Sequence, residues 1–265
     1  MGTTQVRVRR ERPTAAAWAL ALLLTMLVVF ALTLGATAPD AVESVSAAPR
    51  VTRQVVFAAM ECWCVSMGRY EDAGRARIEA AGCASGGGAG MVQQIDGGWH
   101  VLGAMYASER AAKRVAGRLE AKGFPAEVLR LRADRVELRI TAPERQIEAI
   151  AAADAALRDR MKQLDDMALQ LDHGELQTDG ARTLCALACT ETDQTRQALA
   201  MQSGASESGL SAALVEALEA LSAQLRDISD SGQTSRVALS GMLRLAEIDA
   251  FLRLRALQQA LGAGV

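Results

Sequence analysis

The hydrophobic pattern of this chain begins with an apolar run from Ala15 to Leu34, in which only Thr25 and Thr33 are polar. As a helix, this run rises about 30 Å, which matches the hydrocarbon core of a bilayer. Arginines precede the run and acidic residues follow it, at Arg7, Arg9, Arg10 and Arg12 and at Asp40 and Glu43. This charge bias predicts a cytoplasmic N-terminus over residues 1–14, a transmembrane helix over 15–36 (Ala15 to Ala36) and an extracytoplasmic remainder.

A cleaved secretory signal is the alternative interpretation of the same run. Ala36-Thr37-Ala38 has the small-x-small form of a cleavage site. The apolar core of a signal is usually about 7–15 residues, which is shorter than this run. Both interpretations place the bulk of the protein outside the cytoplasm. Residues 37–53 mix Pro, Ser and Ala without periodicity, which predicts a linker.

Over residues 54–140 the pattern alternates between strand-like and helix-like stretches. Period-two alternation predicts the strands, and helical spacing closed by glycine predicts the helices between them. The predicted strands are Met60 to Tyr70, Met91 to Ile95, Trp99 to Tyr106 and Ala126 to Leu131, and the predicted helices are Glu71 to Gly82 and Ser108 to Gly123. The order β-α-β-β-α-β predicts an α+β, ferredoxin-like unit with both helices on one face of its sheet. Val136 to Ile140 is expected as a strand added to the edge of this sheet.

From residue 141 to the C-terminus, apolar residues recur at spacings of three and four. Four helical stretches are expected: one that starts at the capping signal Thr141-Ala-Pro-Glu144, one over about 179–201, one through Leu214 and Ile228, and one that reaches about Leu261. Short connections predict an up-down helical bundle over 141–265. A long coiled coil is disfavoured because Asp154 interrupts the heptad pattern. We expect 54–140 and 141–265 to fold separately; the alternative is shared burial, in which the first bundle helix covers the sheet.

The sheet unit contains an internal repeat. Val65-Ser-Met-Gly-Arg-Tyr70 and Val101-Leu-Gly-Ala-Met-Tyr106 each lead to a helix that closes on Arg-aliphatic-Glu-Ala-x-Gly. With Trp99 before the second stretch, these motifs resemble the SPOR (sporulation-related repeat) family over about residues 54–132. Ser66 stands where that family usually has Gln, and Ala104 where it usually has Gly. The resemblance implies a peptidoglycan-binding module that hangs from one membrane helix and binds septal glycan strands on the open face of its sheet.

Strand alternation and the resemblance together select the candidate glycan-binding residues. If Trp63 and Val65 point toward the helices, then neighbouring side chains in the strands point toward the opposite face. There a sugar chain would meet hydrogen-bonding groups and a flat apolar surface, supplied by Ser66, Gln93 (or Gln94), His100 and Leu102. The alternative is that this face packs against the added strand and the bundle.

Composition and motifs exclude several functional classes. The net charge is −2 and the pI is near 5.8, so no overall positive field attracts nucleic acid. The chain has no Gly-x-Ser-x-Gly or His-Glu-x-x-His motif, and we expect no catalytic residue and no cofactor. Gly86-Gly87-Gly88 lacks the Lys of a phosphate loop and predicts a flexible connection. The carboxylate pairs Asp165-Asp166 and Glu144/Glu148 are expected on solvated helix surfaces.

The cysteines number five, so a complete disulfide framework is excluded. Cys185 and Cys189 are expected to be small buried residues, because a bridge at helical spacing would be strained. Cys62 and Cys64 share a strand face with His100, which raises the alternative of a soft-metal site. A fourth ligand is missing and the spacing is unusual for zinc, so incidental sheet residues are the preferred interpretation and no metal site is expected.

These observations predict a membrane-anchored, non-catalytic protein that binds peptidoglycan glycan strands in bacterial cell division or sporulation. The competing interpretation is a protein–protein scaffold of the cell envelope, with a degenerate SPOR-like unit and a bundle that binds an envelope protein. An envelope enzyme is the least favoured class. The expected partners are therefore peptidoglycan, the membrane through Ala15 to Ala36, and a protein bound by the bundle.

The orientation of the anchor is testable by reversing its flanking charge. Replacing Arg7, Arg9, Arg10 and Arg12 with Glu removes the positive bias, so we expect scrambled topology or failed insertion. Protease accessibility of residues 54–265 in intact cells measures the outcome. Unchanged external accessibility would contradict the predicted orientation.

Overall fold

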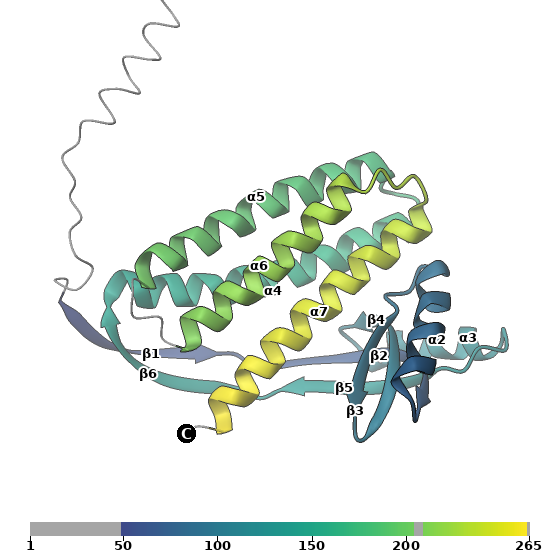
Figure 1. Ribbon diagram of the computed structural model, residues 1–265, viewed down its shortest axis with the longest axis horizontal. Helices are drawn as coiled ribbons and strands as arrows, with labels where there is room; N and C mark the ends of the chain where they lie inside the picture. Colours follow the sequence, from purple (N-terminus) through teal and green to yellow (C-terminus); the bar gives the residue numbers. More distant parts are fainter. Residues whose placement is uncertain (1–48, 204–208, 264–265) are drawn as a thin grey trace, which may run out of the picture. The chain divides into compact units, whose positions relative to one another are not determined.

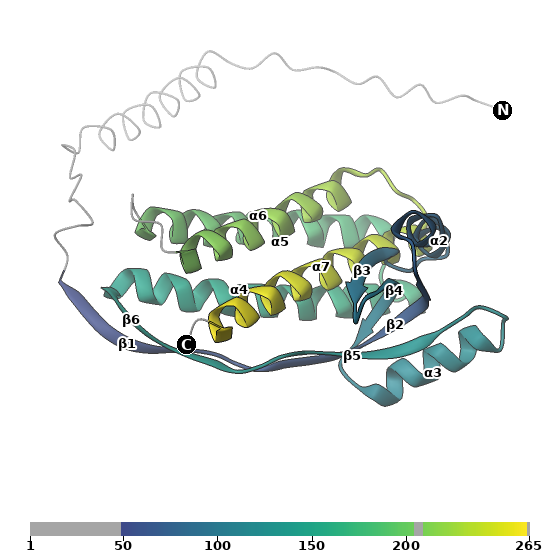
Figure 2. The ribbon, with the colours of Figure 1, turned by 60° about the horizontal axis from the view of Figure 1, so that its bottom comes forward.

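The computed structural model describes residues 49–203 and 209–263, and this part of the chain is an α+β fold with two antiparallel sheets and six helices (Figures 1 and 2). The strands are β1 Arg50–Phe57, β2 Met60–Tyr70, β3 Met91–Ile95, β4 Gly98–Tyr106, β5 Glu127–Ala133 and β6 Val136–Pro143. The helices are α2 Ala73–Ser85, α3 Glu109–Glu120, α4 Glu144–His173, α5 Thr178–Ser203, α6 Gly209–Asp230 and α7 Arg236–Ala263. The predicted membrane anchor and most of the predicted linker lie outside the described residues. Within the described ranges, no helix has the length and apolar character needed to span a bilayer.

The four-stranded sheet consists of the four strands predicted over residues 60–131. Its order is β3-β4-β2-β5, with every neighbouring pair antiparallel. On one face Val65 packs against Ala112 and Ala116 of α3, and Val101 packs against Ala76 and Ala80 of α2. The prediction of which side chains face the two helices is therefore confirmed, because strand alternation fixes the face of every second residue.

The other two strands form a sheet of their own, which the sequence pattern did not predict. β1 pairs with β6 over its whole length, from Arg50 opposite Pro143 to Phe57 opposite Val136. The expectation that Val136 to Ile140 extends the four-stranded sheet is thus wrong, and the linker predicted up to residue 53 ends in a strand. Val55 and Phe57 are buried while Val56 between them is exposed, so one face of this ribbon packs on the helices.

The start of the first bundle helix also differs from the prediction. Thr141 belongs to β6, where its hydroxyl lies 2.8 Å from that of Thr52, and the helix begins at Glu144 without a side-chain cap. Glu144 instead accepts a hydrogen bond from Arg53 at 2.8 Å. The predicted capping box therefore does not form, because the Thr141 hydroxyl contacts Thr52 of β1 instead of the first turn of the helix.

Helices α4 to α7 bury the predicted aliphatic stripes in a common core. The stripe of α4 includes Ile150, Leu157 and Leu164, and that of α6 includes Leu214, Leu221 and Leu225. Cys185 and Cys189 are free, buried thiols of α5, as predicted. Burial raises the pKa of Cys185 to about 12, so its thiol is protonated at neutral pH.

The core of the bundle continues without a break into the four-stranded sheet. Helix α7 passes over the sheet face opposite α2 and α3 (Figures 1 and 2), and Leu102 and Leu131 of that face share one apolar cluster with Phe251 and Leu254. Side chains of α7 also donate to backbone oxygens of the sheet region: Arg244 to Gly87 at 3.2 Å, Arg255 to Arg132 at 3.0 Å and Gln258 to Ala58 at 2.9 Å. The sheet and the bundle thus share burial, and the covering helix is the last one rather than the first.

The loop after α2 approaches α7 at two glycines. A Cβ atom added to Gly241 would lie 2.8 Å from the backbone oxygen of Gly88. Gly87 has a φ of +87°, and a Cβ there would lie 2.7 Å from Val237. The loop that the sequence predicts to be flexible is therefore held against a helix about 150 residues away in the chain.

This contact predicts opposite effects for two Gly→Ala substitutions in helices. Gly241→Ala should destabilise the protein by about 1–3 kcal/mol, because the new methyl group displaces the loop backbone. Gly117→Ala in α3 is the matched control, since its Cβ has no neighbour within 4 Å. It should stabilise the protein by about 0.5–1 kcal/mol through reduced chain entropy. Urea unfolding of the two variants measures both changes; equal effects would contradict the close approach.

Candidate functional site

The predicted glycan face is not open. Ser66 and Leu102 are 0% exposed and His100 is 4% exposed, because α7 covers this side of the sheet. Gln93 is half-buried on the edge strand β3, and Gln94 is exposed. Three of the four predicted glycan contacts are therefore out of reach of a sugar chain, and the expectation of an exposed sheet face is corrected accordingly.

A bulge also separates the residues of the alternative metal site. The register of β2 and β4 shifts so that Cys64 lies opposite Met105, while His100 lies opposite Arg69. Cys62 is hydrogen-bonded to Cys64, and this bond together with burial raises the pKa of the Cys62 thiol. Among the described residues, no group of three or more Cys, His, Asp or Glu side chains is arranged to hold a metal ion.

His100 instead forms a small polar cluster. Its Nδ1 atom lies 2.9 Å from Oε1 of Glu127 and 3.3 Å from the hydroxyl of Ser66. Both partners meet the same ring nitrogen, whereas a Ser–His–acid relay needs the serine and the acid on opposite nitrogens. The cluster therefore satisfies buried polar groups and lacks the geometry of a nucleophile.

The bulge accounts for the Gly-x-Tyr ending of the first repeat. Gly68 has a φ of +124°, and a Cβ there would lie 2.9 Å from the hydroxyl oxygen of Tyr70. The Tyr70 hydroxyl folds back and donates to the Met67 carbonyl at 3.1 Å. Glycine is required here because the strand must turn and make room for the phenol at once.

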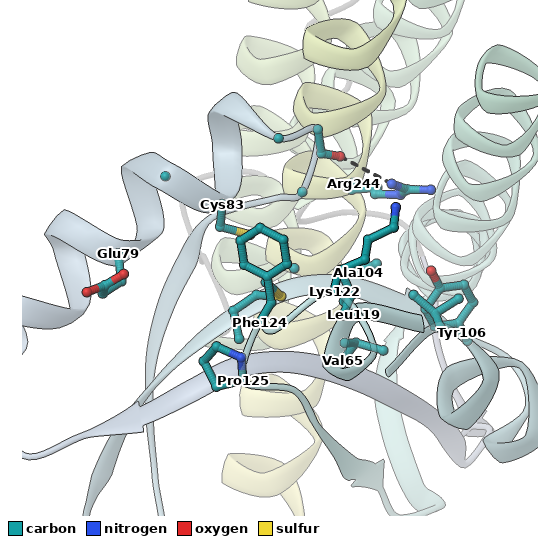
Figure 3. A pocket seen from close by; sticks show the side chains of 17 residues that line it. Val65, Glu79, Cys83, Ala104, Tyr106, Leu119, Lys122, Phe124, Pro125 and Arg244 are labelled. Carbon is teal, nitrogen blue, oxygen red and sulfur yellow. Dashed lines mark hydrogen bonds between the residues drawn. The ribbon is translucent and has the colours of Figure 1, made fainter. Parts of the chain in front are cut away.

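The open cavity of the sheet unit lies on its other face, between α2 and α3. It has a volume of about 440 Å³ (Figure 3). Its floor contains Val65, Met67, Gly103 and Ala104. The cavity exists because Val65 packs with α3 while Val101 packs with α2, in two separate clusters, and the small residues of β4 leave the space between them unfilled.

Two helix ends form the walls of this cleft. Glu79, Gly82 and Cys83 line it from α2, and Gly86-Gly87-Gly88 continues that wall. On the opposite side the lining residues are Val115, Leu119, Lys122, Phe124 and Pro125. Gly123 ends this helical segment with a φ of +84°, and the Phe124 amide donates to Leu119 at 3.1 Å, so the chain reverses and brings Phe124 to the rim.

The charges of the cleft are separated along its length. Two cations, Arg244 from α7 and Lys122, line the cleft, and Glu79 lies well away from both of them (Figure 3). Arg244 is held by Gly87 and by an ion pair with Asp172. Lys122 has no ion pair among the described residues, and its side chain is exposed. The cationic end is therefore suited to an anionic group such as a carboxylate.

Cys83 and Tyr106 are the nucleophilic side chains of the cleft, and both are protonated at neutral pH. Burial raises the pKa of each group. No His or Asp perturbs Cys83, whose charged neighbour is Arg244. A thiol without a base is a poor nucleophile. The arrangement favours binding over covalent chemistry.

Sequence reasoning placed the strand residues of this cleft correctly, but it ended the first helix before Cys83, extended the second beyond Lys122, and did not recognise a site. The available signal was the pair of small residues Gly103 and Ala104 on a helix-facing strand, where larger side chains are usual. Arg244 carries no comparable signal, because its position at the cleft depends on the docking of α7.

Cys83 provides a chemical probe of this cleft. It is partly exposed, whereas the other four cysteines are buried. We expect a maleimide to modify Cys83 alone in the native protein, and more slowly than a free cysteine at pH 8, because the raised pKa lowers the thiolate fraction. The rate should keep rising with pH beyond 9.0, the ordinary value of this thiol. Mass spectrometry locates the adduct, and labelling that persists in Cys83→Ser would contradict the assignment.

Comparisons with protein-family models, with curated proteins and with solved structures find no match for this chain. The functional assignment consequently depends on the residues and contacts of the cleft, together with the motif resemblance in β2 and β4.

Proposed function

We propose that this protein is a membrane-anchored, non-catalytic peptidoglycan-binding protein of the bacterial cell envelope, and that it binds its ligand in the cleft between α2 and α3. In this proposal the four-stranded sheet with α2 and α3 is a SPOR-like unit, and α4 to α7 form an up-down bundle packed on it. The segment Ala15 to Ala36 holds the N-terminus in the membrane. The protein acts in cell division or sporulation.

The observation that supports this site most strongly is the separation of charge in an otherwise apolar cleft. Lys122 supplies a cationic donor, unpaired within the described ranges, at one end, beside the Arg244–Asp172 ion pair, while Leu119, Phe124 and Pro125 supply an apolar wall. Peptidoglycan carries short peptides with carboxylates and alkyl side chains beside its sugars. A carboxylate fits the cationic end and an alkyl group fits the wall.

The covered sheet face directs the proposal toward the peptide part of peptidoglycan. A glycan strand bound to the sheet would have to displace α7, whose contacts include three side-chain hydrogen bonds to the backbone of the sheet region. The cleft needs no such displacement. Intact stem peptides, rather than bare glycan, are therefore the expected ligand.

A protein–protein scaffold is the second candidate, and a feature of the bundle favours it. Leu187 and Met201 on α5 are 58% and 67% exposed. They lie fourteen positions apart, which places them on the same side of the helix. In this second candidate, these two side chains contact the partner protein.

Cosedimentation of the full-length protein with purified sacculi, in a non-ionic detergent, tests the first candidate. We expect the protein to pellet with intact sacculi, and Lys122→Glu to weaken binding about tenfold by reversing a charge that pairs with the ligand. Lys113→Glu is the matched control, because Lys113 lies on α3, the helix that precedes Lys122, outside the cleft, where it pairs with Glu109. Soluble muropeptides should also protect Cys83 from maleimide.

The result also separates the candidates. Pelleting with amidase-treated sacculi, which lack stem peptides, would indicate that the protein binds glycan strands rather than stem peptides. An equal loss in both lysine variants would indicate nonspecific charge attraction. Absence of pelleting with preserved envelope localisation would support the scaffold.

A further inference from the structure

A second cavity lies on the opposite side of the sheet, where the sheet meets α4 and α7. It has a volume of about 390 Å³. Its wall includes Met105 of β4, Met161 of α4 and Phe251 of α7, which are all buried. Asp165 of α4 and Glu247 of α7 are also part of the wall. We call this space the carboxyl cavity.

Glu247 is the unusual member of this wall. Glu247 is only 5% exposed. Among the described residues, its carboxylate has neither a hydrogen bond nor an ion pair. Buried carboxylates are normally paired, because burying an unpartnered charge costs several kcal/mol. Asp165, whose charge acts on Glu247, likewise has no hydrogen-bonding partner in the described part of the chain, and it was predicted to lie on a solvated surface.

The electrostatic surroundings do not neutralise this pair. Desolvation raises the pKa of Glu247, and the charges of Asp165 and Cys64 raise it further. Burial, and then the adjacent Asp166, raise the pKa of Asp165. Arg244 opposes these effects, but its guanidinium is already engaged by Gly87 and Asp172.

The remaining charged groups around the cavity are also engaged or exposed. Arg158 is paired with Asp154 at 2.9 Å and Glu61 with Arg130. Lys162 is exposed and forms no ion pair within the described ranges. Cys62 and Tyr106 complete the titratable groups, and both are neutral because their pKa values are raised.

We propose that the carboxyl cavity binds an alkylammonium group, with Asp165 and Glu247 as its acceptors. An ammonium carries three donors and one positive charge, so it can bond to both carboxylates at once. The thioethers of Met105 and Met161 and the ring of Phe251 suit the attached alkyl chain and the cation. A divalent metal is a poorer fit, since Ca²⁺ needs six to eight oxygen ligands and two carboxyl groups cannot provide them.

Calorimetric titration of the full-length protein with n-butylammonium tests this proposal. We expect saturable binding that weakens about tenfold or more in Glu247→Gln and in Asp165→Asn, which each remove a charged acceptor. Asp166→Asn is the matched control, because Asp166 is exposed on the same helix and does not line the cavity. 1-Pentanol, which has a similar size and no charge, should not bind.

A second readout requires no variant. Because the pKa values of both carboxyls are raised, binding of a cation should release protons. The binding heat should then differ between buffers of different ionisation enthalpy. Proton release distinguishes a ligand site from a packing defect, which would bind no cation and release no proton.

The thermal stability of Glu247→Gln is a control for folding. A pKa raised in the folded state contributes stability below the unfolded value of 4.5, and this contribution is lost as the pH rises through the folded pKa. Above that range Glu247→Gln should melt at a higher temperature than the wild type when no amine is present. This outcome ensures that lost binding in the variant does not reflect unfolding.

Three outcomes would overturn the proposal. The first is unchanged butylammonium affinity in Glu247→Gln and Asp165→Asn, and the second is an equal loss in Asp166→Asn. The third concerns Lys162, whose own ammonium is the internal rival for the cavity. If Lys162→Gln lowers the melting temperature and abolishes the effect of Glu247→Gln, the two carboxylates bind the ammonium group of Lys162 and not an external amine.

Discussion

The packing of α7 against the second face of the four-stranded sheet is the constraint on which the rest of the structure depends. With α2 and α3 both on one side, the other side presents Cys62, Cys64, Leu102 and Leu131, which are nearly free of polar atoms. Such a face must be covered if the sheet is to remain soluble. Helix α7 covers it while also packing on the bundle, so its buried residues extend around most of its circumference. A helix in this position has little surface left for polar residues, and Ser240, Glu247 and Gln258 are consequently buried.

The same packing determines where a ligand can bind. The sheet face implied by the SPOR resemblance is occupied, and the accessible cavity lies between α2 and α3. That cavity in turn depends on α7, because Arg244 anchors the glycine loop that forms one of its walls. The loop can approach the helix only because Gly241 and Gly87 lack side chains. Helix α7 therefore covers one face of the sheet and also holds the glycine loop that lines the cleft on the other face.

Much of the fold could be predicted from local patterns, and the failures share one physical cause. Alternation in β2 and β4 identified the helix-facing residues Val65 and Val101 correctly, because the period of a strand is a local property. The pairing of Arg50–Phe57 with Val136–Pro143 was missed, because pairing partners so distant in the chain leave no local signal. The register shift after Val65 was missed as well, since a bulge depends on the contacts of Gly68 with Tyr70. Sequence periodicity shows how wide an apolar stripe is, but not which surface it meets.

The candidate cleft and the carboxyl cavity lie on opposite sides of the sheet, yet they are not electrostatically independent. Tyr106 lines both spaces, and Arg244, at the cleft, lowers the pKa of both Asp165 and Glu247 in the carboxyl cavity. Arg244 and Glu247 are three residues apart on α7, so they lie on adjacent turns of one helix face. In surroundings of low dielectric, an anion placed beside Arg244 raises the pKa of these carboxyl groups, and a cation beside Glu247 lowers it. A change of charge in one cavity thus alters the free energy of ionising the groups in the other. Helix α7 connects the two, because it carries Arg244 at the cleft and Glu247 at the carboxyl cavity.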